Sequence, residues 1–291
     1  MIVPVRALLL ILGVICSAPP VVAQLPFYTD NPQVADLGTL HFEFSNEFDR
    51  LQSSQYPDLR QNTANFRVNY GLPHRLELDF DVPYLAIDRA PGKHSSDGIG
   101  DTDMGVKWNF RAPASDSRAM VLGASLYIEF PTGSVRQQLG SGLSDVWLNF
   151  IAQKPFTPAT RINANVGFLF AGNTSTGVIG ISTMRGNVLT GGISLLHDFT
   201  PRLTLGGEVY GAVADTSGLG REQLQGMLGA EYSLSKRLML TFGVLGGKYE
   251  ASPKIGGQIG FTLDFPAAFH SASMETLPSD MGARTVSAVP H

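Results

Sequence analysis

Charged side chains recur at every second position within several apolar stretches of the sequence. In residues 75–86, Arg75, Glu77, Asp79 and Asp81 alternate with leucine, phenylalanine and valine. In residues 98–111, acids, an amide and bases alternate in the same way with methionine, valine, tryptophan and phenylalanine. Successive side chains of a β-strand point to opposite faces, so these charges would line one face of a sheet. A face of mixed charges can solvate ions and polar solutes.

The candidate functional residues occupy the polar positions of this alternation, on the same face of their strands. They are Glu43, Glu47, Arg67, Glu77, Asp79, Asp81, Asp103, Lys107, Arg111, Glu129, Glu208, Glu231 and Asp264. Acids outnumber bases in the set. Two interpretations stay open, a wet wall whose charges pair across strands and a dedicated binding site, and the first is the simpler one.

No catalytic motif joins these residues. The sequence lacks the G-x-S-x-G, H-E-x-x-H and G-x-x-x-x-G-K patterns. Asp97, Asp101 and Asp103 offer oxygen ligands that would suit Ca²⁺, but a solvated loop and a wet strand face explain them more simply. An enzyme would need a serine and a histidine brought together from different strands. We therefore expect no enzymatic activity, no cofactor and no metal.

The alternation continues along the chain and predicts about twelve strands. They cover residues 39–48, 62–72, 75–86, 98–111, 118–130, 144–153, 161–171, 186–199, 202–213, 222–234, 237–249 and 253–265. The glycine-rich stretch 186–199 does not reveal which of its faces is which. Short turns near Pro73, Ala114, Thr157, Pro201 and Lys236 alternate with longer loops. An even strand number with short turns at one end is typical of bacterial membrane barrels. The predicted fold is thus all-β, a closed antiparallel transmembrane β-barrel.

The placement of aromatic residues separates this fold from a secreted, soluble β protein. A soluble sandwich turns its apolar face to a core, whereas a membrane barrel turns that face to lipid. On the apolar parity, aromatic residues gather at both strand ends. They are Tyr70, Trp108, Phe110, Phe150, Tyr232 and Phe265 at the short-turn end, and Phe48, Tyr84, Phe130 and Phe170 at the other. Two aromatic girdles favour the membrane barrel.

The N-terminus predicts export. Arg6 precedes an apolar run, Ala7–Cys16, and small residues end at Ala23, so residues 1–23 resemble a signal peptide that is cut before Gln24. Ile15 is too large for the alternative, a lipoprotein anchor on Cys16. Charged residues make up only 16% of the chain, against about 25% in soluble domains. We expect residues 24–38 to be a periplasmic segment or a plug, 39–265 the barrel, and 266–291 a disordered tail.

The last predicted strand resembles the terminal signal by which outer-membrane barrels are recognised for assembly. The matching residues are Gln258, Gly260, Leu263 and Phe265. This resemblance implies the barrel-assembly machinery and outer-membrane lipid as partners. No feature of the sequence indicates a nucleic-acid partner.

The order of short motifs over residues 25–265 resembles a family of outer-membrane barrels known as transporters or as the MetA-pathway of phenol degradation. The motifs are Phe27-Tyr28-Thr29-Asp30, Tyr70-Gly71-Leu72, Arg75-Leu76-Glu77-Leu78, Gly98-Ile99-Gly100-Asp101, Gly105-Val106-Lys107 and Pro131-Thr132-Gly133. The resemblance implies a porin-like channel in a Gram-negative outer membrane. Its solutes would be small, including hydrophobic or aromatic compounds, and would diffuse passively through a polar lumen. The alternative is a structural or surface-interaction barrel without flux.

Overall fold

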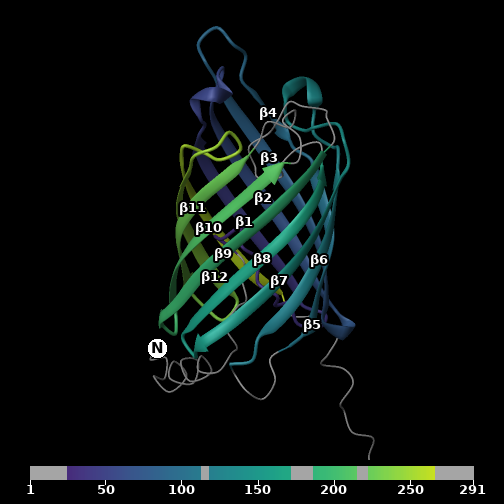
Figure 1. The fold of residues 1–291 in the computed structure, drawn as a ribbon, viewed down its shortest axis with the longest axis vertical. Coiled ribbons are helices and arrows are strands. Elements are labelled where there is room, and N and C mark those ends of the chain that lie inside the picture. The colour runs from purple at the N-terminus through teal and green to yellow at the C-terminus, as the bar shows by residue number, and fades with distance from the viewer. Residues whose placement is uncertain (1–24, 113–117, 172–185, 215–221, 266–291) are drawn as a thin grey trace, which may run out of the picture.

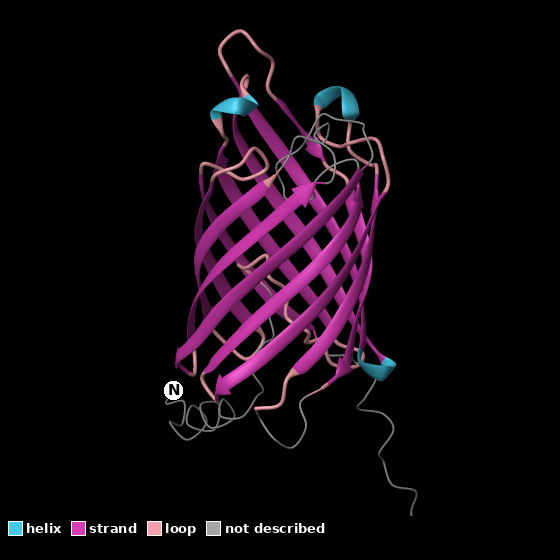
Figure 2. Cartoon of the chain, viewed as in Figure 1, coloured by secondary structure: helices cyan, strands magenta, loops and turns pink. Residues whose placement is uncertain are grey.

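One closed antiparallel β-sheet makes up nearly all of the protein. The computed structural model describes residues 25–112, 118–171, 186–214 and 222–265. Within these residues the sheet has 13 strands. Figure 1 shows them as a barrel whose strands tilt against its long axis, and Figure 2 shows how little helix accompanies them. Because the sheet closes on itself, its wall presents no unpaired edge.

Twelve of the strands are long and form the wall. They are β1 (Leu40–Arg50), β2 (Asp58–Leu72), β3 (Leu76–Arg89), β5 (Thr102–Arg111), β6 (Val121–Phe130), β7 (Asp145–Thr157), β8 (Thr160–Ala171), β9 (Gly186–Thr200), β10 (Leu203–Ala214), β11 (Gln223–Ser233), β12 (Leu238–Gly247) and β13 (Ile255–Phe265). The fourth strand, β4 (Ser96–Ile99), has four residues. Short 3₁₀ turns are η1 (Ser53–Gln55), η2 (Pro73–Arg75) and η3 (Val135–Gln137). In the described part of the chain, no helix is both long and apolar enough to cross a membrane.

The wall follows the order of the chain. Each long strand pairs antiparallel with the next, with β3 passing directly to β5. Strand β13 pairs with β1 from Leu40 opposite Phe265 to Arg50 opposite Ile255, which closes the ring. This confirms the prediction of a closed antiparallel barrel with twelve wall strands.

Some element bounds differ from the sequence prediction. Residues 98–111 are not one strand, because Gly100 and Asp101 separate β4 from β5. Strand β4 begins in the segment predicted as loop, includes the first two residues of the predicted strand, and pairs with the outer end of β3. Strand β7 continues to Thr157, so that the following turn is shorter than predicted. The predicted signal peptide, the turn near Ala114 and the tail 266–291 lie outside the described residues.

The two faces of the wall alternate as the sequence indicates. All ten girdle aromatics are exposed on the outer face. The structure also assigns the faces of β9, where Leu189, Ile193 and Leu195 point outward and Thr190 and Ser194 are buried. The outer surface is therefore apolar with aromatic residues at both ends, and the polar residues lie inside.

Candidate functional site

Most of the predicted polar residues lie inside the barrel. Seven are buried, namely Glu43, Glu77, Asp79, Asp81, Lys107, Glu208 and Glu231, and Arg67, Asp103, Glu129 and Asp264 are half-buried. Glu47 is also buried. Arg111 is the exception, because it is exposed. The pairing of β5 with β6 shifts register between Trp108 and Arg111, which ends the strict alternation before that residue.

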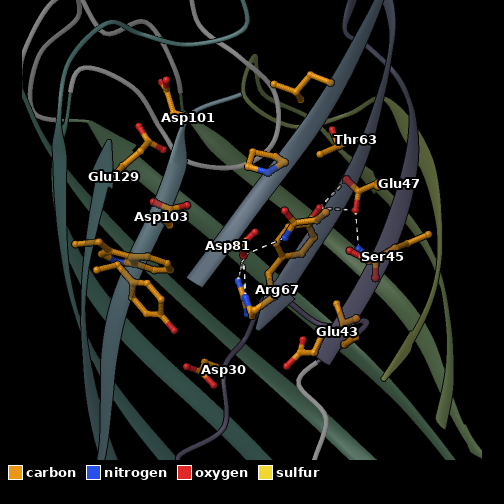
Figure 3. Close-up of a pocket in the computed structure, with 18 of the residues that line it drawn as sticks. Asp30, Glu43, Ser45, Glu47, Thr63, Arg67, Asp81, Asp101, Asp103 and Glu129 are labelled. Carbon is orange, nitrogen blue, oxygen red and sulfur yellow. Dashed lines mark hydrogen bonds and ion pairs between the residues drawn. The ribbon is translucent and has the colours of Figure 1, made fainter. Parts of the chain in front are cut away.

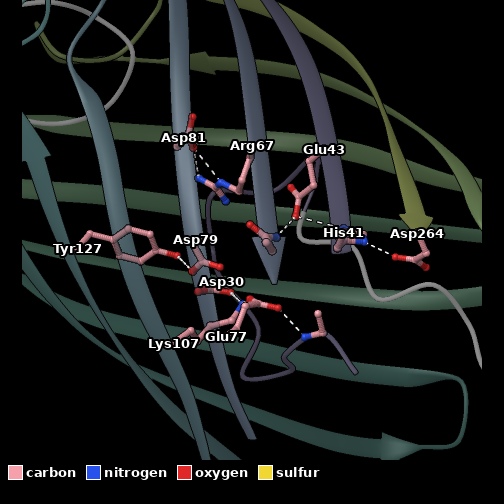
Figure 4. Close-up of polar contacts among 12 residues, drawn as sticks. Asp30, His41, Glu43, Arg67, Glu77, Asp79, Asp81, Lys107, Tyr127 and Asp264 are labelled. Atoms are coloured by element: carbon pink, nitrogen blue, oxygen red, sulfur yellow. Dashed lines mark hydrogen bonds and ion pairs between the residues drawn. The ribbon is translucent and has the colours of Figure 1, made fainter. Parts of the chain in front are cut away.

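A buried ammonium group joins the wall to the N-terminal segment. Lys107 Nζ lies 3.3 Å from Glu77 Oε1 and 3.4 Å from Asp30 Oδ1 (Figure 4). The other Glu77 oxygen accepts a hydrogen bond from the Ala35 backbone N–H. Burial raises the pKa of Asp30, and Lys107 opposes that shift. Residues 30–35 are thus attached to β3 and β5 through charge-assisted contacts, which are stronger than neutral hydrogen bonds.

A second polar chain runs across the junction between β13, β1 and β2. His41 on β1 contacts Asp264 of β13 through Nδ1 at 2.5 Å and Glu43 through Nε2 at 3.3 Å. Asn69 of β2 donates to the same Glu43 carboxylate at 2.9 Å. Figure 4 shows Asp264, His41 and Glu43 next to one another along this junction. Charges therefore pair across the strands that close the barrel.

The segment 25–38 runs inside the wall. The Tyr28 and Thr29 backbone N–H groups donate to the two Glu208 oxygens at 3.0 and 2.6 Å. The Tyr28 hydroxyl donates to Glu47 at 2.6 Å. Phe27 packs against the buried residues Leu196, Met227 and Leu245. The segment therefore makes both polar and apolar contacts with the inner wall of the barrel.

The loop after β6 folds over the outer part of the interior. Asp101 accepts hydrogen bonds from the Gly133 and Ser141 backbone N–H groups, both at 2.9 Å. Leu139 is 1% exposed and packs on Leu85 and Ile87. These contacts hold the loop inward, since its backbone donors have partners in the wall.

The three acids considered for Ca²⁺ have separate roles. Asp101 holds the loop, and Asp97 accepts a hydrogen bond from the Tyr84 hydroxyl at 2.5 Å. Asp103 points into the barrel (Figure 3). Among the described residues, no group of three or more histidine, cysteine or acidic side chains could hold a metal ion.

A cavity of about 290 Å³ remains between the N-terminal segment and the loop. Carboxylates of Glu47, Asp81, Asp103 and Glu129 line it, and so does Arg67 (Figure 3). Its aromatic lining comes from Phe27, Tyr28, Tyr127, Trp147 and Tyr210. The interior can thus hold a small solute between charged and aromatic surfaces.

Glu231, a predicted lumen residue, does not line this cavity, and polar side chains near it contact one another across strands. Arg161 of β8 binds Asp198 at 2.8 Å and lies 3.9 Å from Glu231. His197 lies near its strand end, where its ring packs edge-on against Phe199 and its Nδ1 is 2.8 Å from Thr160 Oγ1. These contacts brace neighbouring strands.

Sequence reasoning missed the apolar part of the lumen. Leu169, Val188, Leu196, Met227 and Leu245 are buried inside the barrel. The sequence feature that indicates them is an apolar neighbour in the chain, as in Leu195-Leu196 and Met227-Leu228. In a strand, adjacent apolar residues necessarily occupy both faces.

The four residues of the predicted assembly signal lie on β13. Gln258 faces inward and donates to Glu47 at 3.0 Å, while Leu263 and Phe265 face outward next to β1. A Cβ at Gly260 would approach the Phe44 carbonyl oxygen to 2.5 Å, so glycine permits close contact with β1 there.

Several solved structures share this fold. The COG4313 outer membrane channel from Pseudomonas putida F1 has a TM-score of 0.65 at 15% identity, covering 80% of this chain and 98% of that one. The KdgM porin, in complex with disordered oligogalacturonate, gives 0.52 at 11% identity, covering 77% and 99%. The NanC porin gives 0.50 at 8% identity, covering 77% and 98%. At these identities the likeness concerns the fold alone.

The sequence comparisons are more specific. No curated protein sequence matches the chain. The family model described as the MetA-pathway of phenol degradation matches residues 50–265, which include every wall strand except most of β1. The chain therefore belongs to this family, as the motif order in the sequence predicts.

Proposed function

We propose that this protein is an outer-membrane channel through which small solutes diffuse passively. The observation that carries the proposal is the contrast between the two faces of the wall. The outward face is apolar and ends in exposed aromatics such as Trp108 and Phe48, whereas the inward face is charged and surrounds a cavity of about 290 Å³. An apolar band between two aromatic girdles suits lipid, and a polar lumen suits solute passage.

The same proposal places the mature protein in the bacterial outer membrane. Residues 1–23 would be removed before Gln24, and the barrel-assembly machinery would insert the product through the signal on β13. Intact-mass measurement and membrane fractionation test this step. A product that retains Arg6, or one found in the soluble periplasm, would refute it.

The solutes that the interior favours are small and partly aromatic. Five aromatic residues line the cavity, and the family description refers to phenol degradation. A related barrel in fold, the COG4313 protein, is described as an outer membrane channel. Uptake of small aromatic compounds into proteoliposomes, compared with uptake of sugars of similar size, measures this preference.

A barrel without flux is the second candidate, and the N-terminal segment is the observation that favours it. Residues 25–38 contact Glu208, Glu47 and Glu77 inside the wall, and we propose that they act as a plug. Conductance of the purified protein in a planar bilayer separates the two candidates. Discrete current steps are expected for a channel. If current steps are absent both from the complete protein and from a form lacking residues 25–34, the barrel without flux is the remaining candidate.

A further inference from the structure

Four carboxylates form a continuous row across the inner wall. Asp81 of β3 lies opposite Asp103 of β5, Asp103 lies opposite Glu129 of β6, and Glu129 lies opposite Asp145 of β7. All four line the cavity described above. Figure 3 shows Asp81, Asp103 and Glu129 on the strands that bound it. Like charges directly opposite one another on neighbouring strands are destabilising, so this row favours a positive partner.

The positive charge that the wall provides to this row comes from Arg67, which also acts electrostatically on Asp103. Arg67 binds Asp81 through Nε at 2.8 Å and through NH2 at 2.6 Å. Within the described ranges, Asp103 and Glu129 make no hydrogen bond and no salt bridge. The charged groups that act on Glu129 are three other carboxylates, those of Asp101, Asp103 and Asp145. The middle of the row is therefore open to a cation from outside the chain.

Two aromatic rings are seated next to the row. Tyr127 and Trp147 have ring centroids 6.1 Å apart. A Cβ at Gly105 would come within 2.3 Å of the Tyr127 ring, and a Cβ at Gly167 within 2.3 Å of Trp147 Nε1. Tyr127 donates to Asp79 at 2.6 Å and Trp147 to Thr190 at 3.2 Å. The two glycines thus leave space for the rings, and hydrogen bonds fix the polar ends of both rings.

Asn149 gives an independent indication of a guest. Its side chain is 2% exposed and lines the same cavity. Its Oδ1 has no hydrogen-bond partner among the described residues. A buried acceptor without a partner is costly, and an N–H donor of a bound solute would supply one.

We propose that this cavity binds a small organic ammonium ion. The ammonium group lies against Asp103 and Glu129, and the apolar or aromatic body lies against Tyr127 and Trp147. Ring faces attract cations, so both surfaces favour the same guest. The row is extended rather than convergent, which does not suit a metal ion. The inference names the solute class of the proposed channel and rests on that function for the route by which the solute arrives.

The chain contains a fluorescent reporter for this site. It has two tryptophans, and Trp108 faces outward while Trp147 lines the cavity. In Trp108→Phe, Trp147 is the sole tryptophan. We would titrate this folded protein with phenethylammonium, phenethyl alcohol and phenylacetate, which share a ring and differ in charge. Saturable change in Trp147 emission is expected for the ammonium, binding about tenfold weaker for the alcohol, and none for the anion.

Matched variants test the role of the row. Asp103→Asn combined with Glu129→Gln should weaken binding of phenethylammonium about tenfold and leave that of phenethyl alcohol unchanged. Asp88→Asn removes an exposed outward charge and should change neither. The amide substitutions relieve repulsion, so the folded gel band should persist, and Glu129→Gln alone should give a smaller loss in the same direction.

Two results would overturn the inference. Equal binding of the ammonium and the alcohol would show that the cavity binds only the apolar part of the solute. Displacement of phenethylammonium by equal concentrations of Na⁺ or Ca²⁺ would show that the site binds cations in general and is not specific for organic ammonium ions. Because binding is measured in detergent and conductance in a bilayer, the two proposals fail separately. A conducting barrel that does not bind the ammonium refutes only this site, and a binding barrel without conductance refutes only the channel.

Discussion

Lys107 of β5 and Glu77 of β3 lie directly opposite each other, with Nζ and Oε1 3.3 Å apart. Both side chains are almost completely buried. Asp30 of the N-terminal segment approaches the same Nζ at 3.4 Å. One ammonium group therefore contacts two carboxylates that belong to different parts of the chain. A barrel wall and the segment inside it share this single charge.

Lys107→Met should destabilise the barrel strongly. The substitution leaves Glu77 and Asp30 buried without this cation, and breaking a buried pair from one side costs about 3–5 kcal/mol. The temperature at which the folded band disappears on gels of progressively heated samples measures the loss. Lys93→Met, on an exposed loop, is the control and should leave that temperature unchanged. Equal effects of the two substitutions would show that the buried contact contributes nothing.

The faces of β3 can be tested with adjacent residues. Phe80 is 46% exposed on the outer face, midway between Leu76 and Tyr84. Phe80→Arg should impair assembly, because a cation near the bilayer midplane costs about 2–4 kcal/mol. Asp79→Asn should assemble and mainly reduce cation selectivity, since an amide still accepts the Tyr127 hydroxyl. Normal assembly of Phe80→Arg would contradict the assignment of the outer face to lipid.

Much of this architecture follows from side-chain alternation. Arg75–Ala86 predicts both faces of its strand, because each polar residue is followed by an apolar one. The positions of Glu77, Asp79 and Asp81 inside the wall follow from the same pattern. Glycine has no side chain to mark a face, and for that reason the faces of residues 186–199 required the structure.

Contacts between distant segments could not be predicted. Tyr28 reaches Glu47 and Glu208 from a segment with no periodic pattern. Asp101 holds the loop at Gly133 and Ser141, 32 and 40 residues further along the chain. Such contacts depend on how loops return into the closed barrel, which local sequence does not encode.

The N-terminal segment should limit the conductance. Glu208→Gln replaces one acceptor oxygen with a donor amide, so Tyr28 and Thr29 can no longer both donate to it. Single-channel current should rise from the complete protein to Glu208→Gln, and further when residues 25–34 are deleted. Glu222→Gln, on an exposed residue before β11, is the matched control and should conduct as the complete protein does. An unchanged current after the deletion would exclude the plug.

Closure of the barrel depends on its last strand. β13 pairs with β12 on one side and, over the whole of β1, from Leu40 to Arg50, on the other. Deletion of Gln258–Phe265 would leave β12 and β1 without a partner strand and expose unpaired backbone groups to lipid, so the barrel should not form.

Truncation after Phe265 leaves this pairing complete, so the shortened protein should still give a heat-modifiable folded band. Phe265→Ala should reduce that band, because it removes the last outward aromatic next to Leu40, and Phe199→Ala, at the end of another strand, should reduce it less. Loss of the folded band on removal of residues 266–291 alone would show that the tail is needed for folding, and that β13 is not sufficient to close the barrel.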